Sequence, residues 1–118
     1  MLHLRPRLGH GGRMNPVISA HAFGLLLKDG PFVIDVRRPD EFAEGHVEGA
    51  RLFPLDELVP ATVAAFRAEG NETIYILCKS GMRAAKAAEK FRACGVGGIC
   101  VVEGGTVACF EAGLPVVK

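Results

Sequence analysis

The chain has 118 residues, of which 49% are hydrophobic and 23% are charged, and its formal net charge is +1. This length suits one domain with its own hydrophobic core, and the composition is that of an ordinary globular protein rather than a disordered one. The near-neutral charge gives no reason to expect nucleic acid or a membrane surface as a partner. No apolar stretch approaches the roughly 18 residues that a membrane helix needs.

The first 14 residues differ in character from the rest of the chain. They contain Arg5, Arg7 and Arg13, no acidic residue, and a glycine-rich stretch over residues 9–12. Such a segment buries too little apolar surface to offset the entropy of ordering it. It also lacks the hydrophobic core of a secretory signal. We therefore expect a flexible leader over residues 1–14 and a folded domain over residues 15–118.

From Val17 onward, short apolar runs alternate with helical patterns, which is typical of a parallel sheet covered on both faces. Ser19 is expected to cap a first helix that carries Phe23 inward. An apolar strand follows over residues 32–36, and its single carboxylate, Asp35, needs a partner. A helix begins at Pro39. The later elements are a strand over 50–53, a segment over 55–69 that becomes helical with Val63 and Phe66 inward and closes at 70–71, a strand over 73–77, a helix over 82–94, a strand over 98–102 and a helix over about 105–112.

Cys78 stands where the strand over 73–77 gives way to the helix that begins at Met82, with Gly81 in the short loop between them. Backbone N–H groups of such a loop, together with a helix N-terminus, curl around a sulfur atom and stabilise negative charge on it. The thiolate is the nucleophilic form of cysteine. We therefore expect Cys78 to be a nucleophile, although an isolated cysteine is more often an inert packing residue.

Several further motifs accompany this loop in a definite order: Phe32-Val33-Ile34-Asp35-Val36-Arg37, Glu41-Phe42, Gly45-His46-Val47, Gly49-Ala50, Leu52-Phe53-Pro54-Leu55, Cys78-x-x-Gly81-x-Arg83, Val102-Glu103-Gly104-Gly105 and Ala112-Gly113-Leu114-Pro115-Val116. With them, the chain from Pro16 to its C-terminus resembles a single-domain rhodanese, a family of sulfurtransferases. The resemblance implies one α/β domain, with a parallel sheet of about five strands and helices on both faces. It also implies catalysis without a metal or an organic cofactor.

The resemblance further implies that Cys78 takes a sulfane sulfur from a small anionic donor such as thiosulfate and becomes a persulfide. The sulfur then passes to cyanide or to a thiol, which can belong to a small molecule or to a partner protein. No nucleic acid or membrane partner is implied. The substrate-binding loop that the resemblance implies consists of Lys79, Ser80, Gly81, Met82 and Arg83.

Two roles for Arg83 stay open: its charge attracts the anionic donor, or its guanidinium is tied to a carboxylate such as Asp35. Four residues near the expected loop are interpreted as structural support held by hydrogen bonds and ion pairs. His46 is assigned no catalytic proton transfer, because an ionised nucleophile needs no general base. These four supporting residues are Asp35, Arg37, Glu41 and His46.

The remaining cysteines, Cys94, Cys100 and Cys109, are expected to be core or near-core thiols. With Cys78 they form neither a CxxC pair nor another metal-ligand spacing, so we expect no metal site and a reducing, cytoplasmic location. Cys109 stands where the family usually carries tryptophan, which leaves the pocket wall in question. A disulfide between an oxidised Cys78 and Cys100 or Cys109 stays an open alternative.

Two rival functions remain at this point. Phosphatases and arsenate reductases of related architecture also use a cysteine in an anion-binding loop, but five residues separate their cysteine from the arginine. Here only four residues separate Cys78 from Arg83, which disfavours a tetrahedral phosphate and favours a single sulfur atom. The second rival is a sulfur-relay or non-catalytic protein-interaction module, and retention of Cys78 argues against pure scaffolding.

Overall fold

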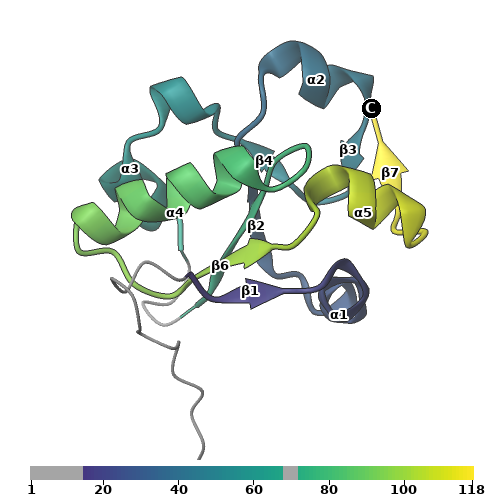
Figure 1. Ribbon diagram of the computed structural model, residues 1–118, viewed down its shortest axis with the longest axis horizontal. Helices are drawn as coiled ribbons and strands as arrows, with labels where there is room; N and C mark the ends of the chain where they lie inside the picture. Colours follow the sequence, from purple (N-terminus) through teal and green to yellow (C-terminus); the bar gives the residue numbers. More distant parts are fainter. Residues whose placement is uncertain (1–14, 68–71) are drawn as a thin grey trace, which may run out of the picture.

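The computed structural model describes residues 15–67 and 72–118. The predicted leader, residues 1–14, and the predicted helix end at residues 70–71 lie outside the described residues. Five parallel strands form one sheet in the order β1-β6-β5-β2-β4, as Figure 1 shows. These strands are β1 (Val17–Ile18), β2 (Phe32–Asp35), β4 (Arg51–Leu52), β5 (Ile74–Leu77) and β6 (Ile99–Val102). The predicted α/β class and the five-stranded parallel sheet are confirmed.

Helices cover both faces of this sheet (Figure 1). On one face, α3 and α4 pack over a cluster that includes Ile34, Ile76 and Phe91. On the other face, α1 and α5 pack over a cluster that includes Phe23, Leu77 and Cys109. The helices are α1 (Ala20–Leu26), α2 (Pro39–Glu44), α3 (Pro60–Ala64), α4 (Met82–Ala93) and α5 (Gly105–Glu111), with short 3-10 turns η1 (Leu27–Asp29) and η2 (Leu55–Glu57).

Two helix starts that the sequence predicts, at Ser19 and Pro39, are present in the structure. The Ser19 side chain accepts a hydrogen bond from the Ala22 N–H at 3.0 Å and thereby caps α1. Pro39 stands at the first position of α2, where its missing N–H leaves no hydrogen bond unmade. The face of α4 that packs on the sheet carries Ala84, Ala87 and Ala88, which are spaced three and four residues apart. Their small side chains let the helix lie close to the sheet. The helix therefore brings its first residue, Met82, close to the carboxyl end of β5.

The segment over residues 55–69 differs from the prediction. It forms η2 and the short α3, which is followed by a turn at residues 65–66. Val63 is fully buried as expected, whereas the predicted burial of Phe66 is wrong, because that residue is 52% exposed. Phe66 lies two residues beyond the last residue of α3, Ala64, so the helical spacing that would have turned it inward no longer applies.

Three strands of two residues each were not predicted from the sequence: β1, at one edge of the main sheet, and two others. β3 (His46–Val47) and β7 (Val116–Val117) pair antiparallel as a separate two-stranded ribbon. Each strand has only two residues, which is too short for an alternating pattern to be recognised. The ribbon joins the segment after α2 to the segment after α5, and it thereby ties both to the same edge of the molecule (Figure 1).

Candidate active site

Cys78 follows the last residue of β5, at the carboxyl end of the parallel sheet. It is 1% exposed and belongs to the apolar cluster beneath α4. The Gly81 N–H donates a hydrogen bond to Cys78 Sγ at 2.8 Å, so the loop folds back over the sulfur. Gly81 has a φ of +116°, a conformation that other residues rarely adopt, and this explains the glycine at the turn into α4.

The first turn of α5 holds the opposite side of this loop. The N–H groups of Thr106 and Val107 donate to the carbonyl oxygens of Cys78 and Lys79, at 2.7 and 3.1 Å. A carbonyl and the N–H of the next residue point in opposite directions across a trans peptide. The N–H groups of Lys79 and Ser80 therefore point away from α5, which leaves them available to a negatively charged group.

Gly105 makes this close contact between α5 and the loop feasible. A Cβ atom there would lie 2.5 Å from the Cys78 carbonyl oxygen and 2.6 Å from that of Lys79, and Gly105 also has a φ of +61°. From the sequence, Gly104 and Gly105 were recognised only as part of a motif, and their role in holding the loop was not predicted. Thr106, which follows, is buried, and its hydroxyl has no hydrogen-bond partner among the described residues.

Arg83, at the other end of the loop, is bound to Glu41 of α2. Its two terminal nitrogens donate to the two carboxylate oxygens at 2.7 and 3.0 Å, and the two side chains are 29% and 14% exposed. This hydrogen bond is the largest cause that lowers the pKa of Glu41 to about 2. It also raises the pKa of Arg83, to which the nearby charges of Glu41, Cys78 and Asp35 add. The partner suggested for Arg83, Asp35, is therefore wrong, and the carboxylate is that of Glu41.

Asp35 is fully buried and pairs with Arg37 instead. Two guanidinium nitrogens and the main-chain N–H of Arg37 donate to the carboxylate at distances of 2.9 to 3.1 Å. The same guanidinium donates to the Gly45 carbonyl at 2.9 Å, which connects the end of β2 to the loop after α2. His46 Nδ1 lies 2.9 Å from the Phe42 carbonyl, and its ring stacks on Phe42 at 3.6 Å. These hydrogen bonds and ion pairs join the end of β2, α2 and the segment after α2 to one another and, through Glu41, to Arg83.

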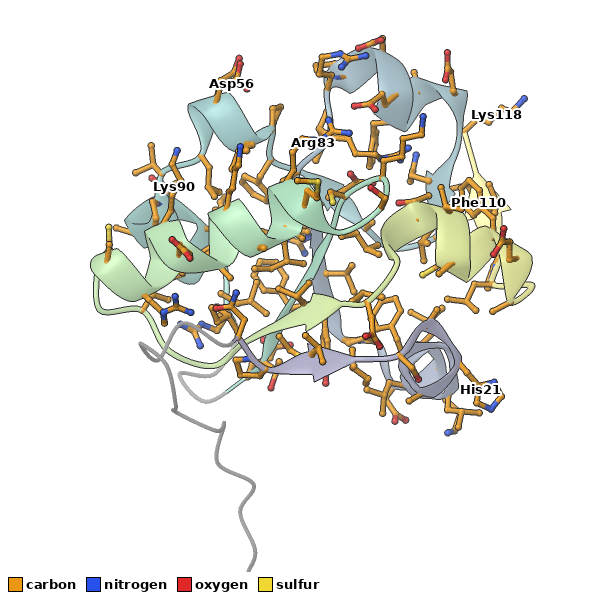
Figure 2. The ribbon with its side chains drawn as sticks, in the orientation of Figure 1. His21, Asp56, Arg83, Lys90, Phe110 and Lys118 are labelled. Carbon is orange, nitrogen blue, oxygen red and sulfur yellow. The ribbon has the colours of Figure 1, made fainter. Side chains whose placement is uncertain are left out.

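The rim of the loop is exposed while the sulfur is not. Lys79 and Ser80 are exposed, and the Met82 side chain is 73% exposed. Figure 2 shows Arg83 at the N-terminal end of α4, beside the loop. The predicted substrate-binding residues thus lie together around Cys78 at one edge of the sheet.

The other cysteines lie away from this loop. Cys109 is fully buried in the cluster on the opposite face of the sheet, and burial raises the pKa of its thiol to about 11. Cys100 is half-buried, and burial raises the pKa of its thiol as well. The expectation that Cys94 is a core or near-core thiol is wrong: α4 ends at Ala93, so Cys94 caps the helix and is exposed.

The family model of the rhodanese-like domain matches residues 19–112, which is most of the chain. The chain belongs to the rhodanese-like domain family. A sulfurtransferase of Allochromatium vinosum is 31% identical to this rhodanese-like domain over 72% of the chain and 77% of the relative. An uncharacterized protein of Synechocystis is 40% identical over 80% of the chain and 51% of the relative.

The chain spans about half the length of several curated relatives that it matches, and 38% of a tRNA uridine(34) hydroxylase of Salmonella arizonae. Among solved structures, the rhodanese-like domain of an Anabaena protein superposes with a TM-score of 0.76 at 25% identity, covering 89% of this chain and 80% of that one. A Rhodopseudomonas palustris protein described as a possible tyrosine phosphatase superposes with a TM-score of 0.73 over 87% of this chain and 85% of that one. Its identity is only 20%, so this likeness concerns the fold alone.

Within residues 15–67 and 72–118, the structure contains no helix with the length and apolar character needed to span a membrane.

Proposed function

We propose that this rhodanese-like domain is a sulfurtransferase that carries sulfur as a Cys78 persulfide. The observation that supports this most is the 2.8 Å hydrogen bond from the Gly81 N–H to Cys78 Sγ within a loop of four residues before Arg83. A sulfur held this way is stabilised as a thiolate, which is the form that attacks. Some cysteine enzymes of other families use a general base to remove the thiol proton. The mechanism proposed here needs none, because an ionised sulfur requires no proton acceptor.

In the first step, the Cys78 thiolate attacks the outer sulfur of a donor such as thiosulfate. A bond forms between the two sulfur atoms, the bond between the outer sulfur and the sulfonate group breaks, and sulfite leaves with its electron pair. The product is an anionic persulfide on Cys78. Lys79 at the rim and the loop N–H groups would stabilise this charge, as they stabilised the thiolate before it.

In the second step, cyanide or a thiolate attacks the outer sulfur of the persulfide. The new bond gives thiocyanate or an acceptor persulfide, and Cys78 leaves as a thiolate ready for another cycle. A thiol on a small molecule and one on a partner protein are chemically equivalent acceptors. We also propose a cytoplasmic location, because Cys78, Cys94, Cys100 and Cys109 are all free thiols.

The engagement of Arg83 disfavours the phosphatase alternative. A cysteine-dependent phosphatase needs an arginine whose forked N–H groups face the phosphate oxygens. Here the two terminal nitrogens of Arg83 both bind Glu41, at 2.7 and 3.0 Å. The guanidinium is thus already paired with a carboxylate, and the loop is one residue shorter than a phosphate requires.

The deciding experiment treats the intact protein with thiosulfate and measures its mass. We expect a gain of one sulfur atom that cyanide or a small thiol removes, and we expect Cys78→Ala to lose both the gain and turnover. Wild-type hydrolysis of an aryl phosphate should be negligible. Activity that survives in Cys78→Ala would overturn the assignment of the nucleophile. Cys78-dependent phosphate hydrolysis without sulfur transfer would support the phosphatase, and no persulfide with any donor would support the interaction module.

A further inference from the structure

Exposed apolar side chains gather on α5 and β7, next to the loop that holds Cys78. Val107 and Phe110 of α5 are 41% and 38% exposed, and Val116 and Val117 of β7 are 45% and 37% exposed. Val107 and Phe110 are three residues apart, so they lie on one face of the helix. We call these four residues, Val107, Phe110, Val116 and Val117, the apolar strip.

The strip starts at the candidate site and ends on β7. At its near end, the Val107 N–H donates to the Lys79 carbonyl at 3.1 Å, so α5 contacts the loop directly. At its far end, a Cβ atom on Gly45 would lie 3.4 Å from Val116 Cγ1 and 3.9 Å from Phe110 Cζ. Because Gly45 has no side chain, the Phe110 ring and the Val116 side chain approach each other across it. Figure 2 shows Phe110 and Lys118, which follows β7, at the same side of the molecule.

The main chain of β7 is open on the side away from β3. The Glu48 N–H donates to the Pro115 carbonyl at 3.0 Å, so these two opposed residues form a hydrogen-bonded pair. Hydrogen-bonded and non-bonded pairs alternate along antiparallel strands, so the next pair, Val47 and Val116, is non-bonded. The N–H and C=O of Val116 therefore point away from β3. Among the described residues, neither group has a hydrogen-bond partner.

An open strand edge beside an apolar surface suits an extended peptide. A peptide adds to such an edge through main-chain hydrogen bonds, and alternate side chains pack on the neighbouring surface. A small thiol has neither the amide groups nor the length to use these features. Charge selects little here, because residues of both signs adjoin the strip in the sequence: Lys79, Lys118, Glu44 and Glu111.

We propose that the apolar strip and the open edge of β7 bind an extended segment of a partner protein, and that a cysteine of this segment accepts the sulfur from Cys78. The Cys78 side chain is only 1% exposed, so an acceptor thiol has to enter the loop on a narrow chain rather than on a flat surface. A segment bound along β7 and α5 leads toward the loop, because the strip begins there.

The acceptor role rests on the proposed sulfurtransferase activity, whereas binding of the segment does not. In the transfer, the thiolate of the segment attacks the outer sulfur of the Cys78 persulfide. A new bond forms between these two sulfur atoms, the bond to Cys78 Sγ breaks, and Cys78 leaves as a thiolate with the electron pair. The sulfur therefore passes to the partner without an oxidant or a reductant.

The binding test titrates the full chain with a synthetic peptide of alternating valine and threonine residues and follows backbone amide signals by NMR. The peptide has about eight residues, enough to cover the strip at about 3.3 Å per residue, and a serine stands in place of the cysteine. We expect saturable shifts at Val107, Phe110 and Val116, and slower hydrogen exchange at the Val116 amide. The Val117 amide is the internal control, because alternation already pairs it with His46.

Methylation of the peptide amides tests strand addition directly. One version carries methyl groups on every odd-numbered amide, and the other carries them on every even-numbered amide. Only alternate N–H groups of a strand face its neighbour, so one version should bind as before and the other should lose at least tenfold in affinity. A shift by one residue cannot restore binding, because it turns the valines to the other face. Equal affinities of the two versions would contradict strand addition.

Variants of the protein locate the peptide. Phe110→Ser should weaken binding of the serine peptide at least fivefold, and Val107→Ser, at the other end of the strip, should weaken it as well. Leu25→Ser is the matched control: it removes an apolar side chain that is 61% exposed on α1, and it should leave binding unchanged. Equal effects of Leu25→Ser and Phe110→Ser, or the absence of shifts along the strip, would overturn the proposed surface.

The acceptor test loads Cys78 with thiosulfate and compares the cysteine form of the peptide with free cysteine. We expect the peptide to accept sulfur with a kcat/KM at least tenfold higher. Phe110→Ser should raise the KM for the peptide at least fivefold and keep transfer to cyanide within twofold. A peptide with no advantage over free cysteine would overturn the acceptor role. If no Cys78 persulfide forms, the sulfurtransferase and the acceptor role both fail, and the serine peptide still shows whether the strip binds a segment.

Discussion

Two cysteines of this rhodanese-like domain are almost completely buried, yet they lie in opposite surroundings. Cys78 is 1% exposed and accepts a hydrogen bond from the Gly81 N–H, at the carboxyl end of the sheet. Cys109 is fully buried within a cluster of apolar side chains on the other face. The two buried thiols therefore differ in their neighbours: a backbone N–H faces the Cys78 sulfur, whereas burial among apolar side chains raises the pKa of the Cys109 thiol.

The same contrast extends to the packing of the surrounding elements. Around Cys78, a loop, the first turn of α5 and an ion pair to α2 meet within a few residues. Around Cys109, α1 and the sheet supply apolar contacts such as Phe23 and Val33. The first region should respond to substitution mainly through sulfur transfer, and the second mainly through stability.

The largest expected effect separates the two thiols directly. Cys78→Ala should abolish persulfide formation with little change in melting temperature. Cys109→Ala should keep persulfide formation within about twofold of wild type and lower the free energy of unfolding by about 1 kcal/mol, because it leaves a small cavity. Intact mass and thermal unfolding measure both. A Cys109→Ala variant that no longer forms the persulfide would show that the two regions are coupled.

Gly105→Ala should be the next most disruptive change. Its Cβ would lie 2.5 Å from the Cys78 carbonyl oxygen, so the loop or α5 has to move. Gly113→Ala is the matched control, since Gly113 also has a positive φ, +81°, but open space around it. Both variants bear the cost of an unfavourable φ, about 1 kcal/mol, and only Gly105→Ala should also slow sulfur transfer. Equal effects of the two on transfer would contradict the proposed role of this contact.

Glu41→Gln should have a moderate effect, because it leaves Arg83 without its charged partner. We expect a loss of about 1–3 kcal/mol in the free energy of unfolding, measured by urea denaturation near pH 7. The pKa of Glu41 is lowered from its ordinary 4.5 to about 2. Its stabilising contribution is therefore complete above pH 4.5 and is lost as the pH falls toward 2.

The control for Glu41→Gln is Asp40→Asn, which removes the exposed partner of Arg38 and should leave stability unchanged. The advantage of wild type over Glu41→Gln should shrink between pH 6 and pH 3. A constant difference across that range would mean that the charge of Glu41 is not what holds Arg83.

The smallest expected effect is the response of the Cys109 cluster to alkaline pH. Burial raises the pKa of the Cys109 thiol from 9.0 to about 11. Between these values the unfolded chain loses the proton while the folded chain keeps it, so the free energy of unfolding falls as the pH rises. Cys109→Ala lacks this term, and its stability relative to wild type should improve from pH 8 to pH 10.5 in urea unfolding. Parallel pH profiles for the two proteins would argue against a buried thiol there.

Much of this domain follows from local sequence signals. The apolar runs of β2, β5 and β6, the Ser19 cap, Pro39 at the start of α2 and the position of Cys78 between a strand and a helix are all local features. Local propensity and turn chemistry act over a few residues, so they can be recognised without a fold. The resemblance of the motifs to the rhodanese family then predicted how these elements combine into one parallel sheet covered by helices.

The tertiary structure alone decided which charges pair and which surfaces stay open. Glu41 and Arg83 are 42 residues apart, and α2 and α4 have to pack before either side chain can choose its partner. The same holds for the contact of α5 with the Cys78 carbonyl, for the exposure of Cys94, and for Phe66 against Arg51. Local patterns determine secondary structure and the position of the proposed nucleophile, whereas ion pairs, pocket walls and burial depend on distances that exist only in the folded chain.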